Sequence, residues 1–195
     1  MSARIAALAV LAATAVSSAN YDGPWVLRAG RSFQQVGQFR IDADPTYRGA
    51  IRALGPASSC RLAAIDSGAI VRWAALGLRI RIATLGVIPP GKTACTAPVD
   101  LKVDNVRITS TRWRTSLGLR VGSSAGALRR LYPHASYHQK GLSEGFPAQS
   151  YWLVTTRTAC LGTCATRFVT VPQLAAGVRE GKVAFFSLRV GAQGE

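Results

Sequence analysis

Acidic side chains are scarce in this chain. Nine Asp and Glu residues stand against 24 Lys and Arg residues among 195, which gives a formal net charge of +15, and 20 of the cations are arginine. No two acids stand in a defined sequence relation, so the paired carboxylates of general acid–base catalysis are not indicated. The charge favours anionic partners such as envelope polymers or acidic protein faces, and we do not expect nucleic acid. A basic solvated surface, or the arginine bias of a GC-rich genome, explains the same composition.

Long apolar runs are absent after Asn20. Arg4 precedes the run Ile5–Val16, and three small residues ending at Ala19 follow it. This order predicts a secretory signal peptide over residues 1–19, because the run is too short to span a bilayer. A buried N-terminal helix is the alternative. No lipidation cysteine follows, so we expect a soluble protein in the secreted, periplasmic or cell-wall space.

Cysteine is infrequent but even in number: Cys60, Cys95, Cys160 and Cys164. In an exported chain this predicts disulfide bonds, and four cysteines leave three connectivities open. Cys160 with Cys164 would close a small loop, which leaves Cys60 with Cys95. A zinc site is the rival interpretation, but neither spacing offers a C-x2-C knuckle.

A short helix is predicted just after residue 43. Asp44 is a suitable N-cap, Pro45 suits the first helical position, and Gly55 with Pro56 ends the segment. The apolar residues between them fall on one helical face: Tyr47, Ala50, Ile51 and Leu54.

The same pattern recurs in the second half of the chain. Gly49–Pro56 matches Gly126–Pro133, and the same shift, with no gap, pairs Val106–Ser110 with Val183–Ser187. Two distant elements that share one offset indicate a tandem duplication. We therefore divide the chain into the signal peptide, an N-terminal segment (20–38), a first unit (39–116) and a second unit (117–195).

Each unit is predicted to run helix, strand, strand, strand. The further strands are Ile70–Trp73 and Leu78–Ile82 in the first unit, and Tyr151–Thr156 and Arg167–Val171 in the second. Short connections favour antiparallel order. The expected fold class is α+β, with two tandem helix-plus-antiparallel-strand repeats whose sheets can join into one open face.

The stretch Leu119–Ser124, followed by Leu128 and Leu131, resembles the helix-entry motif of small exported α+β domains. These are the outer-membrane assembly lipoproteins of the BamE type and the tandem-repeat β-lactamase inhibitor proteins. The resemblance implies two units whose sheets form one face that grips a protein partner. The chain departs from those families in its cysteine positions and in lacking a lipidation cysteine, so inhibition does not carry over.

Two enzyme motifs occur in the sequence. Gly86–Thr93 (GVIPPGKT) fits the phosphate-loop pattern, but the following residues hold Cys95 and a proline instead of a helix, and Pro89 and Pro90 lack backbone donors. We therefore expect no nucleotide and no other cofactor.

The second motif, Gly122–Gly126 (GSSAG), fits the serine hydrolase elbow. No aspartate follows Ser124, and both histidines precede every later glutamate, so the order of a catalytic triad is wrong. Ser124 is predicted instead to be the N-cap of the second helix. His134 and His138, with Glu144, are a conceivable metal site, but Pro133 ends the helix before them, and we expect no metal.

Strand alternation provides the one positive indication of a binding site. If Leu78, Ile80, Ile82, Val106 and Ile108 face the helices, then Arg79, Arg81, Arg107, Thr109, Thr111 and Trp113 face the other way. The offset between the two units places Ala184, Phe186 and Leu188 at equivalent positions, which predicts a face with a basic and an apolar half. The alternative is that the segment Tyr21–Phe39, with Trp25 and Phe33, covers this face.

These observations predict an exported, non-catalytic binding or inhibitor-like module. Its predicted binding residues are Arg79, Arg81, Arg107 and Trp113, and its partner is an extracellular or envelope protein. The alternative is an envelope-associated basic protein held by anionic polymers. A secreted serine esterase is the third and weakest candidate.

Overall fold

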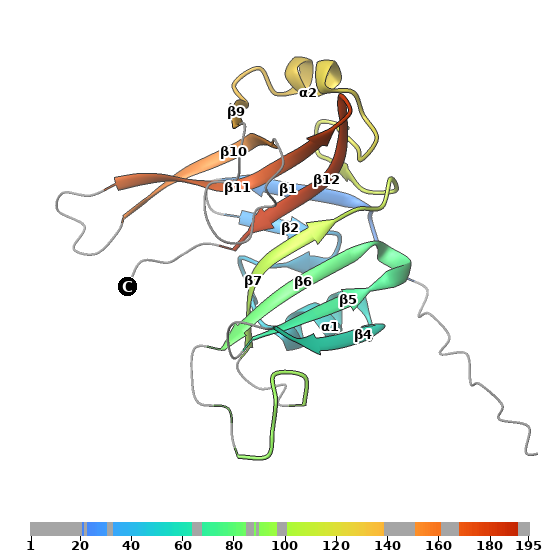
Figure 1. The fold of residues 1–195 in the computed structure, drawn as a ribbon, viewed down its shortest axis with the longest axis vertical. Coiled ribbons are helices and arrows are strands. Elements are labelled where there is room, and N and C mark those ends of the chain that lie inside the picture. The colour runs from blue at the N-terminus through green and yellow to red at the C-terminus, as the bar shows by residue number, and fades with distance from the viewer. Residues whose placement is uncertain are drawn as a thin grey trace, which may run out of the picture.

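Two short α-helices and two separate β-sheets make up the part of the chain that the structure describes (Figure 1). The structure is a computed structural model that describes residues 21, 23–30, 33–63, 68–84, 88, 90–96, 101–138, 151–160 and 168–190. The strand-rich α+β class agrees with the expectation from the sequence. The predicted signal peptide (1–19) lies outside the described residues. No described helix has the length and apolarity needed to cross a membrane.

The larger sheet has eight antiparallel strands in the order β4-β5-β6-β7-β12-β11-β10-β9. Its strands are β4 (Ser59–Leu62), β5 (Ala69–Trp73), β6 (Leu78–Thr84), β7 (Leu101–Ile108), β9 (Ser136–His138), β10 (Tyr151–Cys160), β11 (Phe168–Arg179) and β12 (Lys182–Arg189). β5, β6, β7, β10, β11 and β12 extend strands that the sequence predicts, whereas β4 and β9 are additional. The strands of both predicted units therefore lie in one sheet, and β7 pairs with β12 where the two sets meet.

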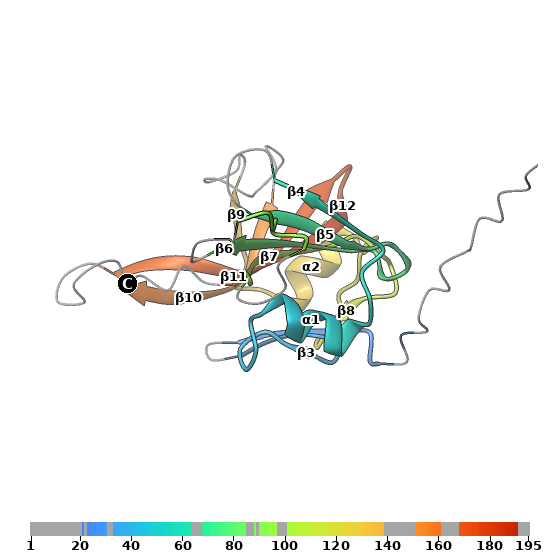
Figure 2. The ribbon, with the colours of Figure 1, turned by 90° about the horizontal axis from the view of Figure 1, so that it is seen from below.

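The smaller sheet comes from segments that the sequence analysis left without strands. It has the order β3-β2-β1-β8, with β1 (Val26–Gly30), β2 (Phe33–Val36), β3 (Phe39–Arg40) and β8 (Arg114–Thr115). β1 and β2 form an antiparallel hairpin, and β8 adds to β1 in parallel. This sheet and the helix α1 (Tyr47–Leu54) lie on the same side of β4–β7 (Figure 2). The segment around Trp25 therefore covers the inner face of the large sheet, not its outer face.

Each helix begins at a hydroxyl cap. The Thr46 hydroxyl accepts a hydrogen bond from the backbone N–H of Gly49 at 3.0 Å, and the Ser124 hydroxyl accepts one from Ala127 at 3.1 Å at the start of α2 (Ala125–Leu131). The predicted cap at Ser124 is confirmed. The predicted cap at Asp44 is wrong, because Thr46 holds the extended cap conformation and Asp44 accepts hydrogen bonds from it. The hydrogen bond from the Thr46 hydroxyl is the main reason that the pKa of Asp44 lies below its ordinary value.

The offset that the sequence predicts between the two units does not hold in three dimensions. Each helix cap forms an isolated β-bridge to the beginning of a strand of the large sheet: Thr46 pairs with Lys102 of β7, and Ser124 pairs with Lys182 of β12. In the strands the matching features are Asp104 in β7 and Ala184 in β12, each the extra residue of a β-bulge against the preceding strand. The spacing of these two bulges differs from the predicted offset by an odd number of positions. An odd shift exchanges the two faces of a strand, because side chains alternate with a period of two.

The core lies between the inner face of the large sheet and the layer made by the helices and the small sheet. Leu78, Ile80, Ile82, Val106 and Ile108 are buried there, as the sequence predicts. Leu128 of α2 and Ala50 of α1 reach the same cluster from the helices. At about 25 cal/mol per Å² of buried apolar surface, this single cluster is the main source of stability.

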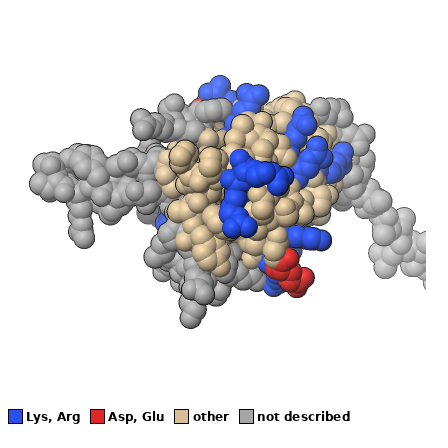
Figure 3. Space-filling model, turned by 90° about the horizontal axis from the view of Figure 1, so that it is seen from above, with Lys and Arg blue, Asp and Glu red and all other residues tan. Residues whose placement is uncertain are grey.

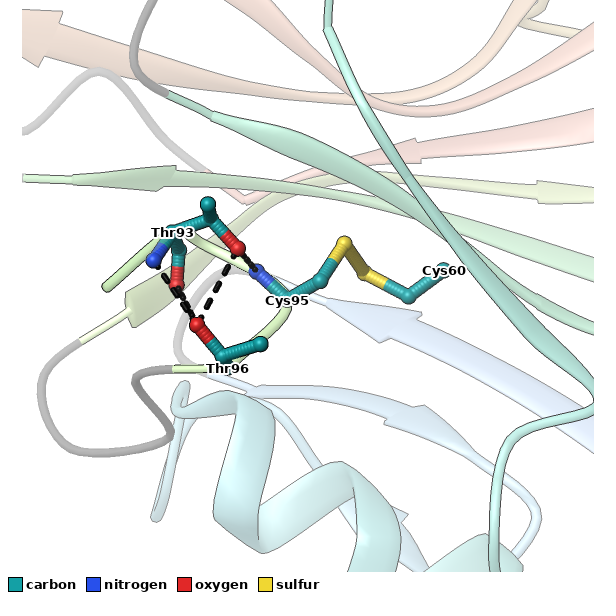
Figure 4. Close-up of a disulfide and its surroundings, with 4 residues drawn as sticks. All are labelled: Cys60, Thr93, Cys95 and Thr96. Carbon is teal, nitrogen blue, oxygen red and sulfur yellow. Dashed lines mark hydrogen bonds between the residues drawn. A yellow bond between two sulfur atoms is a disulfide. The ribbon is translucent and has the colours of Figure 1, made fainter. Parts of the chain in front are cut away.

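One disulfide bond ties a loop to the edge of the large sheet (Figure 4). Cys60 of β4 is bonded to Cys95, with 5.7 Å between the Cα atoms, as the sequence predicts. The loop around Cys95 is a tight turn in which the backbone N–H of Thr96 donates to the Thr93 carbonyl at 2.9 Å. The other predicted disulfide bond, between Cys160 and Cys164, is not tested, because Cys160 is described only through its backbone and Cys164 lies outside the described residues.

Candidate anion-binding face

Three arginines lie in one row on the outer face of the large sheet. Arg72 of β5 is directly opposite Arg79 of β6, and Arg79 is directly opposite Arg107 of β7. The row follows from alternation, since their neighbours along each strand are core residues such as Val71, Ile80 and Val106. Ser59 of β4 and Ser187 of β12 continue the row on its two sides.

A second row runs beside the first, on the same face and one pleat further along each strand. It contains Arg61, Ile70, Arg81, Asn105 and Arg189, each paired with the next. We call the five arginines on β4–β7 the arginine face: Arg61, Arg72, Arg79, Arg81 and Arg107. Directly opposite residues have Cβ atoms about 5 Å apart, so these side chains share one surface.

Few negative charges balance the arginine face. Asp104 lies 3.5 Å from Nε of Arg81, measured to Oδ2. Two other described carboxylates are paired elsewhere, Asp42 with Arg40 and Asp44 with Arg52. Among the described residues no carboxylate forms an ion pair with Arg72, Arg79 or Arg107.

The pKa values of the central arginines show the same imbalance. Partial burial lowers the pKa of Arg79, and the charges of Arg72 and Arg61 lower it further. Partial burial also lowers the pKa of Arg107, with a further contribution from the charge of Arg79. Both effects penalise the charged form, which arginine nevertheless keeps at neutral pH. A bound anion would offset the repulsion between the arginine charges.

An aromatic ring fixes one end of the row. The guanidinium carbon of Arg107 lies 3.9 Å from the centre of the Phe185 ring, a cation–π contact. Phe185 is 2% exposed although it lies on the outer face, paired with Gly177 of β11. A Cβ atom on Gly177 would lie 2.0 Å from the Phe185 ring, so only glycine leaves room for it. Beside this pair, the amide of Asn105 donates to the Ser187 hydroxyl at 2.9 Å.

The structure brings together the three arginines that the sequence predicts, Arg79, Arg81 and Arg107. Sequence reasoning did not single out Arg72 or Arg61. Arg72 was within reach, because it alternates with Val71 and Trp73 in a predicted strand. Arg61 was not, because β4 has no clear alternation and is a strand through its pairing with β5.

The predicted placement of Trp113 on the open face is wrong. Trp113 is 0% exposed, and its indole N–H donates to the Leu76 carbonyl at 2.7 Å. Its ring packs against Trp25, with 4.8 Å between the centroids, and against Tyr21. β7 ends at Ile108 and the chain turns before Trp113, so strand alternation no longer applies there.

The predicted apolar half of the outer face is also wrong. Phe186 pairs with Ile108 and Leu188 with Val106, which puts both on the inner face, and both are 0% exposed. The bulge at Ala184 and the pairing with β7 decide this orientation. The outer positions of β12 are instead Phe185, Ser187 and Arg189.

The enzyme motifs take structural roles where they are described. Residues 90–93, which end the phosphate-loop pattern, and residues 94–96 after it form turns and irregular chain instead of a helix, and Lys92 is exposed. Ser124 of the elbow pattern caps α2. His134 is exposed, the side chain of His138 and all of Glu144 lie outside the description, and the described residues contain no cluster of potential metal ligands.

Further basic side chains occur at the end of the molecule that carries α2 (Figure 3). Arg114, Arg120, Arg129 and Arg130 are exposed there or in adjoining loops. The acidic atoms in this view lie at one margin (Figure 3). Among the described residues of this region, cations pair across strands two at a time, Arg114 with Arg120 and Arg179 with Lys182, and do not form a row of three as on the arginine face.

No protein-family model, no curated protein and no solved structure matches the chain.

Proposed function

We propose that this protein is an exported, non-catalytic binding module whose arginine face recognises an acidic surface of another protein. The observation that carries the proposal is the row of Arg72, Arg79 and Arg107, set in register without a paired carboxylate among the described residues. Arginine is enriched at protein interfaces, and its planar fork binds carboxylates in a bidentate manner.

The row of Arg72, Arg79 and Arg107 lowers the stability of the fold. Like charges directly opposite each other on neighbouring strands destabilise a sheet. Partial burial of Arg79 and Arg107 adds a desolvation cost. A local feature that works against the fold is typical of a functional site.

The non-catalytic part of the proposal is supported by the role of Ser124. Its hydroxyl accepts from Ala127 at the start of α2, which accounts for the serine without a triad. The Cys60–Cys95 bond supports an oxidising, extracytoplasmic compartment, where such bonds persist.

We also propose that residues 39–116 and 117–195 are tandem copies. In support, each copy has a capped helix followed by four antiparallel strands of the large sheet. The last of these strands, β7 in one copy and β12 in the other, has a bulge near the middle of its pairing with the preceding strand, at Asp104 and at Ala184. The resemblance to the tandem-repeat inhibitor proteins points the same way. The arginine face then belongs to the first copy, while the second has Phe185 and Ser187 at the corresponding outer positions.

A second candidate is association with an anionic envelope polymer. The basic side chains at the α2 end favour it, because a flexible polyanion needs no register (Figure 3). The register of the arginine row separates the candidates, since a protein partner requires it and a flexible polyanion does not, whereas salt weakens both kinds of charged contact.

The experiment is a pull-down from envelope and culture-fluid fractions at low and high salt. It compares the wild type with the triple variant Arg72→Gln, Arg79→Gln, Arg107→Gln and with the control Arg114→Gln, Arg120→Gln, Arg130→Gln. We expect one protein to be retained at low salt by the wild type and the control but not by the first variant, with less of it retained at high salt. Equal losses in both variants would favour the polymer, and retention by all three proteins would contradict the proposal. Thermal melts of each variant establish that it is folded.

A further inference from the structure

We infer that the acidic surface bound by the arginine face is an α-helix that lies across β5, β6 and β7 and presents carboxylates at positions i, i+3 and i+7. This inference rests on the proposed function, because it names the partner of the same site. It starts from the direction of the row of Arg72, Arg79 and Arg107, which crosses the strands.

Spacing across the sheet distinguishes the possible partners. Neighbouring strands are about 4.8 Å apart, so the row places arginines at about 0, 4.8 and 9.6 Å. A helix rises about 1.5 Å per residue, which puts positions i, i+3 and i+7 at about 0, 4.5 and 10.5 Å on one side. An extended segment presents same-side residues about every 6.8 Å, and its third charge falls about 4 Å beyond the row.

Along the strands the pattern of charge is broken. Beside Arg72 lies Ile70, so β5 presents one cation to this face. Beside Arg107 lies Asn105, and the next cation on this face of β7 is Lys102, beyond the bulge at Asp104. β6 presents Arg79 and Arg81, and Arg81 already lies near Asp104. An extended acidic segment parallel to the strands would therefore meet fewer unpaired charges than a helix across them.

The row has one open end and one fixed member. Ser59 continues it beyond Arg72 and is exposed, so a helix can extend past the arginines on this side. On the other side Ser187 and Ala175 are 3% and 1% exposed, so the helix ends near Arg107. Arg107 is held against Phe185, so its guanidinium cannot spread freely to suit a different charge spacing.

The test uses three fluorescent peptides of equal net charge in fluorescence anisotropy titrations. The first is an Ala-based helix with Glu at i, i+3 and i+7; the second is the same helix with its three Glu residues distributed around the axis; the third alternates Glu with Thr and contains proline, so that it stays extended. Circular dichroism confirms each conformation. The titrations use the wild type, Arg79→Gln, Arg79→Lys and the control Arg130→Gln.

We expect the first peptide to bind about tenfold more tightly than the other two, because it alone places three carboxylates over the row of arginines at once. Arg79→Gln should abolish this preference, Arg79→Lys should restore part of it through charge alone, and Arg130→Gln should leave it unchanged. If all three peptides bind with equal affinity and Arg79→Gln weakens each of them, the helix inference is wrong and the proposed function stands. If Arg79→Gln changes the affinity of none of the peptides, both the inference and the proposed function are contradicted. If no peptide binds while the pull-down partner still requires the arginine row, the inference alone is wrong.

Discussion

Arg107 lies over the ring of Phe185, and that ring lies over the bare Cα of Gly177. Three neighbouring strands thus contribute a cation, an aromatic platform and the space that the platform needs. This stack stands at the boundary between the arginine face and the buried outer positions Ser187 of β12 and Ala175 of β11. It links a glycine in the second half of the chain to the position of an arginine in the first.

The first prediction concerns Gly177. Gly177→Ala should lower the free energy of unfolding by about 1–3 kcal/mol, because the new methyl group overpacks against Phe185. Gly126→Ala is the matched control: its nearest neighbour is 3.7 Å away, so helix propensity should leave stability unchanged or raise it. Denaturant unfolding measures both. If Gly177→Ala costs the same with Phe185 present as in a Phe185→Ala background, the stack is not as described.

A second prediction concerns Trp113. Trp113→Ala should cost about 3–5 kcal/mol of stability, because it empties a fully buried site. Trp113→Phe keeps most of the packing but leaves the Leu76 carbonyl without its donor, which should cost about 1–3 kcal/mol. Thr111→Ala, at an exposed position of the same turn, is the control. If Trp113→Ala melts cooperatively near the wild-type temperature, Trp113 is not buried and the prediction from the sequence that it lies on the surface is right.

The third prediction separates binding from stability at Arg79. Arg79→Gln should leave stability unchanged or raise it at low salt, because it removes repulsion from Arg72 and Arg107. Added NaCl should stabilise the wild type more than the variant, since screening acts on the same repulsion. Arg48→Gln on the exposed side of α1 serves as the control in thermal melts at several salt concentrations. Clear destabilisation by Arg79→Gln would assign the arginine a structural role.

A fourth prediction addresses the disulfide bond. Cys60 and Cys95 are 35 residues apart, so replacing both with alanine should lower stability by about 4 kcal/mol if loop-closure entropy dominates. Under reducing conditions the wild type and the double variant should melt at the same temperature. Mass analysis after thiol alkylation identifies the bond. Free alkylation of Cys60 in the folded, oxidised protein would show that the bond does not form.

The fifth prediction tests the role of Ser124. Ser124→Ala should cost about 1 kcal/mol, and Ser124→Asp should restore most of it, because aspartate also caps helices. Thr46→Ala should cost a similar amount at α1. Hydrolysis of an activated ester, measured alongside, should not depend on residue 124. An esterase activity lost in both Ser124 variants would restore the catalytic interpretation.

Local rules predicted much of the arginine face. Alternation along Leu78–Ile82 placed Arg79 and Arg81 on the side opposite Ile80, and the structure agrees. The same rule failed in β12, where Phe185 and Phe186 are both apolar and the pattern does not say which faces inward. Pairing of Phe186 with Ile108 settles that choice, and this contact joins strands from the two predicted units.

What the sequence by itself determined is local: the strands with clear alternation, the serine cap of α2 and the scarcity of acids that leaves arginines unpaired. Each depends on neighbours close by in the chain, where backbone geometry and side-chain chemistry act directly. The tertiary structure decided that β4 and β7 flank β5 and β6, so that Arg72, Arg79 and Arg107 form one row. It also decided that Trp113 closes the core against Trp25, because the partners that bury these side chains come from distant parts of the chain.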